Sequence, residues 1–324
     1  MSESRFKTMK DLPAAHLLGT GTAMCAGCGG LEVLHEVYDL LGEKTVFINA
    51  AGCMTLLAVY PYTPFRGSWL YTSMASAPAG AQGVRDALDI LLDKQRITAE
   101  ENLEAVVLTG DGSAYGMGLS ATSGALERNL HFLYLCYDNE GYGNTGQQTS
   151  AATPHAARTA TNKGLAGYPG FKKDLFAIWA AHQPAYVATV VGAEPLDLAR
   201  KIEQAKTLRG PRLILALAPC PTGWDFDPQE TVQIGKLAVR VAKQVGYTSA
   251  GTVEFGAAER LPGKQAGELA FVWRQYYGST PRRDCLEQGL GCLGERGQRI
   301  SVQYDGSPAL QGSKCQFFRF CPDA

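Results

Sequence analysis

Two cysteines near the amino end of the chain carry thiols that could bind a metal or undergo redox chemistry. They are Cys25 and Cys28, in the segment CAGC, and an amphipathic helical pattern follows them directly. A C-x-x-C pair before a helix fits a thioredoxin-like dithiol, half of a zinc site, or part of an iron–sulfur site with four thiolate ligands. The pair alone leaves these three interpretations open.

Two further cysteines each follow an apolar segment of strand length. Cys53 comes just after the predicted strand 45–50, and Cys220 comes just after the predicted strand 213–218. If these strands are parallel, their carboxyl ends share one edge of a sheet, and all four thiols can meet there. Four thiolate ligands that meet at one edge of the sheet favour an iron–sulfur cluster.

An aspartate flanked by glycines follows another predicted strand. Asp111 lies between Gly110 and Gly112, and glycine allows the backbone to approach a phosphate group closely. The tripeptide by itself also fits an ordinary Asp–Gly turn. However, Asn139 follows the next predicted strand, 28 residues after Asp111. An aspartate and an asparagine at successive strand ends, with this separation, are typical of a site for Mg²⁺ and thiamine diphosphate.

Alternating strand and helix patterns must position these residues. The predicted strands are apolar throughout, as strands covered on both faces are, and comprise 45–50, 69–72, 105–109, 132–137, 186–191 and 213–218. Amphipathic helical patterns occupy 31–41, 82–94 and 197–208, and a crossover helix is predicted over 115–128. This alternation predicts an α/β fold, with a mostly parallel sheet and helices on both faces.

Composition excludes several classes of protein. Of the 324 residues, 45% are hydrophobic and 19% charged, which supports a packed core rather than a disordered chain. The 37 glycines show no three-residue period, and nine cysteines are too few for a disulfide-stapled scaffold. A net charge of −1 gives no reason to expect binding to nucleic acid or to a membrane surface. With no signal peptide or membrane-spanning apolar run, we expect a cytoplasmic location.

The pattern changes towards the carboxyl end. We expect residues 1–250 to form the domain that holds the cofactor and the cluster, and residues 251–324 to form an irregular C-terminal extension or arm. Four cysteines in the extension have spacings that match no metal-site template: Cys285, Cys292, Cys315 and Cys321. Cys136 lies within a predicted strand, so we expect it to be a small buried residue.

Together, these segments resemble one family, the thiamine diphosphate-binding β subunits of 2-oxoacid:ferredoxin oxidoreductases, and its pyruvate-type branch most closely. The matching segments, in the family's order, are GTAMCAGCGG, AAGCM, GDGSAYGMG, YDNEGYGNTGQQTSAATP and APCPTGW. The resemblance implies the thiamine diphosphate-binding fold. Two departures concern the substrate: Thr149 stands where pyruvate-type members usually carry arginine, and the segment 63–77 is less apolar than usual.

The resemblance implies a role for each matching residue. The implied ligands of a [4Fe–4S] cluster are Cys25, Cys28, Cys53 and Cys220. The implied ligands of Mg²⁺ are Asp111, Asn139 and the carbonyl group of Gly141. The implied contacts with thiamine diphosphate are Gly52, Cys53, Gly110, Asp111, Gly112, Asn139, Asn144 and Thr145. Of these residues, Asn144 is implied to lie near the reactive ring and is the candidate catalytic residue.

The resemblance also implies a reaction and partners. The reaction is the oxidative decarboxylation of a 2-oxoacid, commonly to an acyl-CoA and CO₂, with electrons passed singly to the cluster. The partners are a pyrimidine-binding α subunit, a γ subunit and a ferredoxin-like subunit, with ferredoxin or a flavin subunit as acceptor. Because another subunit is implied to supply the activating glutamate, we expect the chain to be inactive alone. A thioredoxin-like dithiol reductase and a zinc-stapled, non-catalytic assembly subunit remain as alternatives.

Overall fold

A single mixed sheet forms the centre of the molecule. The computed structural model describes residues 4–14, 16–155, 157–162 and 167–240, with the backbone of two further strands at 245–248 and 253–255. The six parallel strands are β1 (Thr45–Ala50), β2 (Ser68–Thr72), β3 (Glu104–Gly110), β4 (Phe132–Asp138), β5 (Tyr186–Val191) and β6 (Pro211–Leu217). They lie in the order β2-β1-β3-β4-β6-β5, and the antiparallel strands β7 (Val245–Thr248) and β8 (Val253–Phe255) continue the sheet beyond β5. The predicted α/β class and mostly parallel sheet are confirmed.

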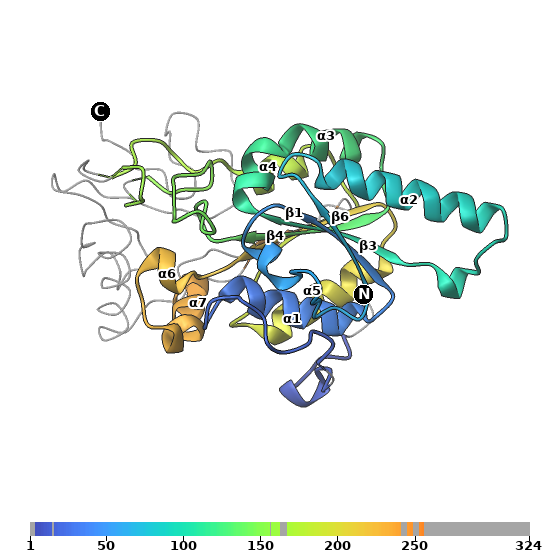
Figure 1. Ribbon diagram of the computed structural model, residues 1–324, viewed down its shortest axis with the longest axis horizontal. Helices are drawn as coiled ribbons and strands as arrows, with labels where there is room; N and C mark the ends of the chain where they lie inside the picture. The colour runs from blue at the N-terminus through green and yellow to red at the C-terminus, as the bar shows by residue number, and fades with distance from the viewer. Residues whose placement is uncertain are drawn as a thin grey trace.

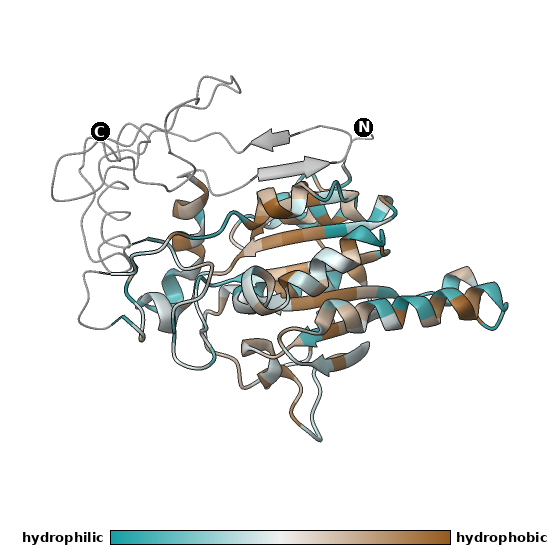
Figure 2. Ribbon diagram, turned by 90° about the horizontal axis from the view of Figure 1, so that it is seen from above, coloured by the Kyte–Doolittle hydropathy of each residue, from teal (hydrophilic) through white to brown (hydrophobic). Residues whose placement is uncertain are grey.

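Helices cover both faces of this sheet (Figure 1). One face carries α1 (Gly29–Leu41) and α5 (Pro195–Thr207), and the other carries α2 (Ala77–Asp93), α3 (Leu119–Glu127) and α4 (Leu175–Ala180). Two separate clusters of buried side chains result, one containing Val33 and Ile202 and the other containing Ala81 and Trp179. Because both faces are covered, the central strands are hydrophobic along their length (Figure 2).

The helix α1 follows the cysteine pair directly and packs on the sheet through one stripe. It begins at Gly29, one residue after Cys28, and ends at Leu41. Its fully buried side chains include Val33, Leu34 and Val37, at the spacing expected for one face of a helix. The packing of this stripe fixes the amino end of α1, and therefore the cysteine pair, relative to the sheet.

Two expectations about burial are wrong, one in β2 and one in α2. The predicted strand at 69–72 is present as β2, but it is an edge strand, with Leu70 42% exposed and Tyr71 54% exposed. A short apolar run does not reveal whether both of its faces are covered. The amphipathic helix predicted over 82–94 is expected to bury Leu91. The second half of α2 extends past the sheet (Figure 1), so Leu91 is 38% exposed.

The crossover between β3 and β4 contains two helical pieces rather than the single predicted helix. A π-helical segment, η4 (Gly112–Met117), follows Asp111, and α3 (Leu119–Glu127) begins after Gly118. A π-helical turn accommodates more residues per turn than an α-helix and is often found at functional sites. Here it directly follows the aspartate of the candidate site.

The remaining expectations concern the cysteines and the carboxyl end. Cys136 lies in β4 and is fully buried, as predicted. The cysteines of the predicted extension lie outside the described residues: Cys285, Cys292, Cys315 and Cys321. Of the predicted extension 251–324, the structure describes the strand β8, which pairs with β7. Within the described ranges, no helix is both long enough and apolar enough to cross a membrane.

Candidate functional site

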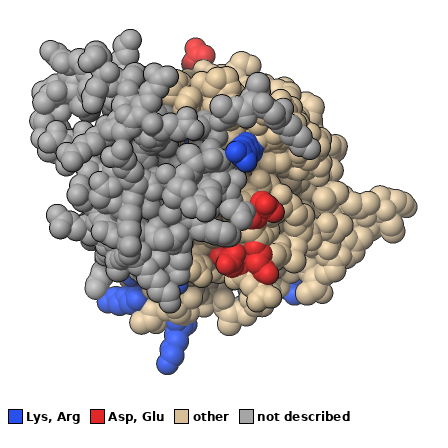
Figure 3. All heavy atoms as spheres, turned by 90° about the vertical axis from the view of Figure 1, so that its left-hand side faces the viewer, with Lys and Arg blue, Asp and Glu red and all other residues tan. Residues whose placement is uncertain are grey.

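Four neighbouring strands bring the candidate residues to one rim of the sheet. The strands β1, β3, β4 and β6 are adjacent and parallel, so their carboxyl ends lie side by side. Cys53 follows β1, Asp111 follows β3, Asn139 follows β4, and Cys220 follows β6 within three residues. Figure 3 views the end of the molecule that carries these loops, and shows acidic side chains grouped on this face.

Three polar groups converge at this rim. One terminal atom of the Asn139 amide lies 2.8 Å from Asp111 Oδ1 and 2.7 Å from the carbonyl oxygen of Gly141. If that atom is nitrogen, the amide donates to both oxygens. If it is oxygen, three acceptors face one another, and a cation between them makes the arrangement favourable. A carboxylate, an amide oxygen and a backbone carbonyl are ligands that suit Mg²⁺.

The carboxyl group of Asp111 is buried and held by a hydrogen bond. Its side chain is only 1% exposed, and the Ser150 hydroxyl donates to its Oδ2 at 2.5 Å. Burial raises the pKa of Asp111 well above its usual range, and the nearby Asp138 raises it further, while Ser150 and Lys172 oppose this shift. The ionised form of Asp111 is therefore unfavourable here without a cation beside it.

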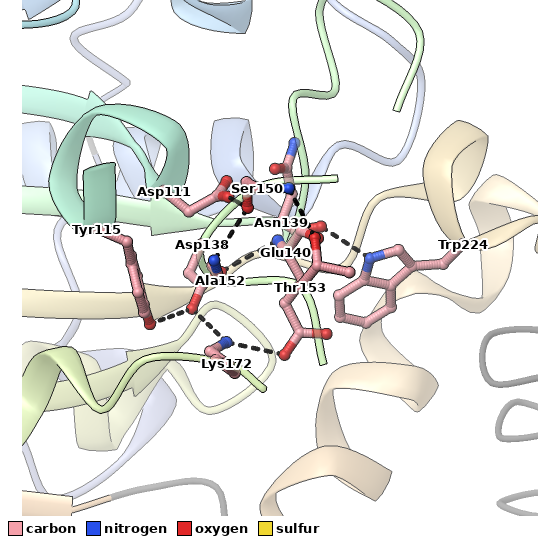
Figure 4. Close-up of polar contacts among 10 residues, drawn as sticks. All are labelled: Asp111, Tyr115, Asp138, Asn139, Glu140, Ser150, Ala152, Thr153, Lys172 and Trp224. Atoms are coloured by element: carbon pink, nitrogen blue, oxygen red, sulfur yellow. Dashed lines mark hydrogen bonds and ion pairs between the residues drawn. The ribbon is translucent and has the colours of Figure 1, made fainter. Parts of the chain in front are cut away.

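A buried ion-pair network surrounds Asn139 (Figure 4). Its chain neighbours Asp138 and Glu140 both accept from Lys172 Nζ, at 2.6 Å and 2.9 Å respectively. The Tyr115 hydroxyl, from η4, also donates to Asp138, at 2.6 Å. Through this network, the segment that follows Asp111 is joined to the segment that contains Asn139.

The loop that follows Cys220 packs against the same segment. Trp224, in the short helix α6 (Pro221–Trp224), donates its Nε1–H to the carbonyl oxygen of Asn139 at 2.9 Å (Figure 4). The Gln147 amide lies between Gly141 and Gly223, because a Cβ at either glycine would overlap it. Both polar atoms of that amide are buried and have no hydrogen-bond partner among the described residues. The loops of the candidate cluster and magnesium sites are therefore in direct contact.

The four candidate cluster cysteines lie within electrostatic reach of one another. All are free thiols, and burial raises the pKa of Cys28 to about 11 and that of Cys53 to about 12. The other cysteines of the set, Cys25 and Cys220, contribute to both of these shifts. In the part of the chain that the structure describes, no group of three or more His, Cys, Asp or Glu side chains is arranged to hold a metal ion. The thiols thus share one neighbourhood without a closed ligand geometry.

Close packing fixes the loops that carry these cysteines. Gly27, between Cys25 and Cys28, has a φ of 65°, and a Cβ there would lie 2.5 Å from the carbonyl oxygen of Pro228. The Thr231 hydroxyl donates to the carbonyl oxygen of Gly27 at 2.7 Å. Only glycine combines this backbone conformation with so close an approach. The cysteine pair is therefore attached to the segment before α7 (Thr231–Arg240).

Tyrosine rings fill the space beside the three glycines expected to contact the cofactor. A Cβ on Gly52 would lie 2.7 Å from the Tyr137 hydroxyl oxygen, and a Cβ on Gly110 would lie 3.2 Å from the same ring. A Cβ on Gly112 would overlap the ring of Tyr142. Packing against these two tyrosines is thus one reason for glycine at all three positions.

The structure does not bring Asn144 and Thr145 into the network around Asp111. Both residues are exposed, in a loop closed by a bridge between Tyr142 and Gln148. The Thr145 hydroxyl donates to the Gln148 side chain, and the Gln148 amide donates to the Thr145 carbonyl oxygen at 2.7 Å. Contact of Asn144 or Thr145 with a cofactor therefore remains a prediction.

Five residues that support the site were not expected from the sequence: Tyr115, Gln147, Ser150, Lys172 and Trp224. Four of them lie within the quoted motif segments, so their nearness to the motif residues was an available signal. Lys172 lies in the segment FKKD, outside every motif, and nothing in the sequence marks it. Only the fold brings Lys172 to the end of β4.

Much of the chain matches known proteins in sequence. Residues 50–216 match the model of the C-terminal TPP-binding domain of thiamine pyrophosphate enzymes. Pyruvate synthase subunit PorB of Methanocaldococcus jannaschii is 38% identical over 233 residues, covering 71% of this chain and 78% of that protein. PorB of Methanosarcina barkeri is 41% identical over 236 residues, covering 71% and 77%. Ketoisovalerate oxidoreductase subunit VorB of Pyrococcus abyssi is 36% identical over 242 residues, covering 73% and 76%.

A solved structure shares the fold. The 2-oxoglutarate:ferredoxin oxidoreductase of Magnetococcus marinus superposes with a TM-score of 0.55 and 18% sequence identity, covering 86% of this chain and 95% of that chain. At this identity, the likeness concerns the fold alone. None of these comparisons supports a thioredoxin-like reductase or a zinc-stapled assembly subunit.

Proposed function

The chain belongs to the family of PorB and VorB proteins, the β subunits of 2-oxoacid:ferredoxin oxidoreductases, and from this we propose that its rim binds Mg²⁺, thiamine diphosphate and a [4Fe–4S] cluster. As one subunit of an oxidoreductase complex, it would take part in the oxidative decarboxylation of a 2-oxoacid, with CoA as the common acyl acceptor. The names of these relatives refer to pyruvate and ketoisovalerate, which are both 2-oxoacids.

The observation that carries the magnesium proposal is the convergence of Asp111, Asn139 and the Gly141 carbonyl. These groups meet at 2.7 and 2.8 Å around one amide atom. The surroundings favour a cation, because Asp138 and Glu140 share one ammonium group, that of Lys172, and the buried carboxyl group of Asp111 lies close enough to Asp138 for the two to repel each other. A divalent cation would offset the excess negative charge and would bridge to a diphosphate.

The donor set supports the cluster proposal. Four cysteines on loops at one rim supply thiolate ligands alone, as a [4Fe–4S] cluster requires. Cys25 and Cys220 lie close enough to Cys28 and Cys53 to raise the pKa values of those two thiols. Binding of a cluster would hold all four as thiolates in spite of the raised pKa values of Cys28 and Cys53, since thiolates are the form that binds metal. Zinc has the same preference for thiolates, so the metal itself must be measured.

Thiamine diphosphate, when bound, supplies the carbanion chemistry of decarboxylation, and an iron–sulfur cluster supplies one-electron acceptance. The residues of this chain hold these groups and set their spacing. Asp111 and Asn139 would hold the metal, Ser150 orients the Asp111 carboxyl group, and burial excludes water from it. The Trp224–Asn139 hydrogen bond joins the two loops, so that the cluster would lie near the cofactor. We place the candidate catalytic contact at Asn144.

We propose that other subunits complete the enzyme. A pyrimidine-binding α subunit would supply the activating glutamate, and γ and ferredoxin-like subunits would complete the complex. Ferredoxin or a flavin subunit would accept the electrons, in the cytoplasm. Within this chain, residues 1–250 would form the cofactor- and cluster-binding domain, with residues 251–324 as an extension or arm.

The experiment that tests this proposal compares cofactor content in matched variants. Asp111→Asn and the control Asp86→Asn, on the exposed side of α2, would be purified anaerobically within the complete complex. We expect Asp111→Asn to weaken Mg²⁺-dependent thiamine diphosphate binding at least about tenfold while the iron content stays unchanged, because only the magnesium site loses its charge. Unchanged thiamine content in Asp111→Asn would contradict the proposal.

A further inference from the structure

Lys172 lies far from the motifs in the sequence but adjacent to Asn139 in space. It precedes α4, and its ammonium group reaches the end of β4, where it contacts Asp138 Oδ2 at 2.6 Å and Glu140 Oε1 at 2.9 Å. The side chains of both acidic residues are almost completely buried, at 3% and 2% exposed, and that of Lys172 is 24% exposed. This is a buried ion-pair triad rather than a surface salt bridge.

The triad encloses the residue that faces Asp111. Asp138 and Glu140 are the immediate chain neighbours of Asn139, and Lys172 holds both of their carboxylates. The backbone of Glu140 adopts a φ of 62°, in the left-handed region, and its N–H donates to Asp138 Oδ1 at 3.0 Å. Without Lys172, two buried carboxylates would repel each other across this turn. The turn therefore depends on one cation for its shape.

The neighbouring Lys173 contacts the segment that follows Asp111. Lys173 Nζ donates to the carbonyl oxygen of Tyr115 at 2.8 Å, in the π-helical segment that follows Asp111. The Tyr115 hydroxyl in turn donates to Asp138, the partner of Lys172. The pair Lys172–Lys173 thus connects the Asp111 segment to the Asn139 segment.

We propose that Lys172 is a positioning residue, which fixes Asn139 and the Gly141 carbonyl at the separation from Asp111 that Mg²⁺ requires. This inference rests on the proposed magnesium site. Mg²⁺ demands nearly ideal octahedral geometry, whereas Ca²⁺ accepts flexible and irregular sites. A turn held rigidly by a buried triad is therefore expected to matter more for Mg²⁺ than for Ca²⁺.

Positioning and simple electrostatics predict opposite results. A lysine near a cation site repels the cation, so electrostatics alone predicts that removal of Lys172 strengthens Mg²⁺ binding. The positioning role predicts that removal weakens it. The direction of the change thus separates the two effects.

The test uses the complete complex, purified anaerobically, with thiamine diphosphate binding followed while Mg²⁺ or Ca²⁺ is titrated. The variants are Lys172→Met, Lys172→Arg and the control Lys94→Met, at the exposed end of α2. We expect Lys172→Met to need about 10–100 times more Mg²⁺ for half-saturation, the range found for residues that orient metal ligands. We also expect a smaller change for Ca²⁺, partial rescue by Lys172→Arg, and no change in the control. Iron content should stay at the wild-type value throughout.

A second variant covers the case in which Lys172→Met does not fold. The double variant Lys172→Met/Glu140→Gln removes one positive and one negative charge, so the net charge of the network is unchanged. We expect it still to need more Mg²⁺ than the wild type. Equal or tighter Mg²⁺ binding in either variant would overturn the positioning role. A wild-type complex that binds no thiamine diphosphate with Mg²⁺ would instead overturn the proposed function.

Discussion

Gly29 donates its backbone N–H to the carbonyl oxygen of Pro219 at 3.1 Å, and this contact joins the two segments that carry Cys28 and Cys220. A Cβ on Gly29 would lie 2.7 Å from Pro219 Cδ and 2.9 Å from its carbonyl oxygen, closer than side-chain carbons approach backbone atoms. Because Cys28 precedes Gly29 and Cys220 follows Pro219, this contact sets the separation of the two cysteines before any metal binds.

The first prediction is that Gly29→Ala lowers the iron content. The added methyl group must push the Pro219 backbone away, which displaces Cys220 from Cys28. We expect the purified complex to lose most of the iron attributable to this chain, together with the visible absorption of that cluster. The measurement is iron and sulfide analysis of anaerobically purified complex.

A matched control is available in α2. Gly83 lies on the exposed side of that helix, and a Cβ there would meet nothing within 4 Å. Gly83→Ala should keep its full iron content and gain up to about 1 kcal/mol of helix stability. If Gly29→Ala kept as much iron as Gly83→Ala, the Gly29–Pro219 contact would not govern the positions of the cysteines.

The second prediction concerns the link between the two loops. Trp224→Phe removes the donor to the Asn139 carbonyl oxygen, which costs about 1 kcal/mol, the net contribution of a typical hydrogen bond. We expect thiamine diphosphate binding at limiting Mg²⁺ to weaken about fivefold, the factor that corresponds to that energy. Iron content should not change, because the cysteines are untouched.

Trp69→Phe serves as the control for this variant, since Trp69 lies in the edge strand β2 rather than at the rim. Cofactor binding should be the same in Trp69→Phe and in the wild type. Loss of affinity in both variants would indicate a general effect of removing an indole, and would count against a specific role for the Trp224 hydrogen bond.

The third prediction concerns pH. Burial, together with the nearby Glu32 and Asp39, raises the pKa of Glu36 from 4.5 to about 8. Its Oε2 is buried and has no hydrogen-bond partner among the described residues. Between pH 4.5 and about 8, the folded chain therefore binds a proton at Glu36 that the unfolded chain has released. Stability consequently falls as pH rises through this window, by at most about 1.4 kcal/mol per pH unit.

Glu36→Gln should remove this dependence. The amide is isosteric with the protonated acid and cannot ionise, so the variant should gain stability relative to the wild type as pH rises from 5 to 8. The measurement is the thermal midpoint of both proteins across that range. A difference in midpoint that does not change with pH would show that Glu36 titrates normally.

The strands could be predicted where the sheet buries both of their faces. The runs at 45–50 and 186–191 match β1 and β5 in their bounds, because continuous burial leaves a continuous apolar run. The exposure of Leu70 could not be predicted, since the edge position of β2 depends on which strands pair with it. The antiparallel addition of β7 and β8 was also not predicted, because their short segments carry no clear periodicity.

The candidate site was predictable to the extent that it depends on strand ends. Asp111 and Asn139 directly follow the adjacent parallel strands β3 and β4, and their proximity follows from that topology alone. Lys172 could not be found in this way, because its partner Asp138 is 34 residues distant and their contact depends on the path of the chain before α4. Long-range ion pairs of this kind leave no local pattern in a sequence.

The central claim is that one rim of the sheet holds a [4Fe–4S] cluster beside thiamine diphosphate. Its most direct test is the metal, sulfide and thiamine content of the anaerobically purified complex with wild-type chain, with Cys53→Ala, or with the buried control Cys136→Ala. We predict that Cys53→Ala lacks about four irons and four sulfides per chain that the wild type and the control contain. Equal iron in all three proteins, or stoichiometric zinc in place of iron, would contradict the account.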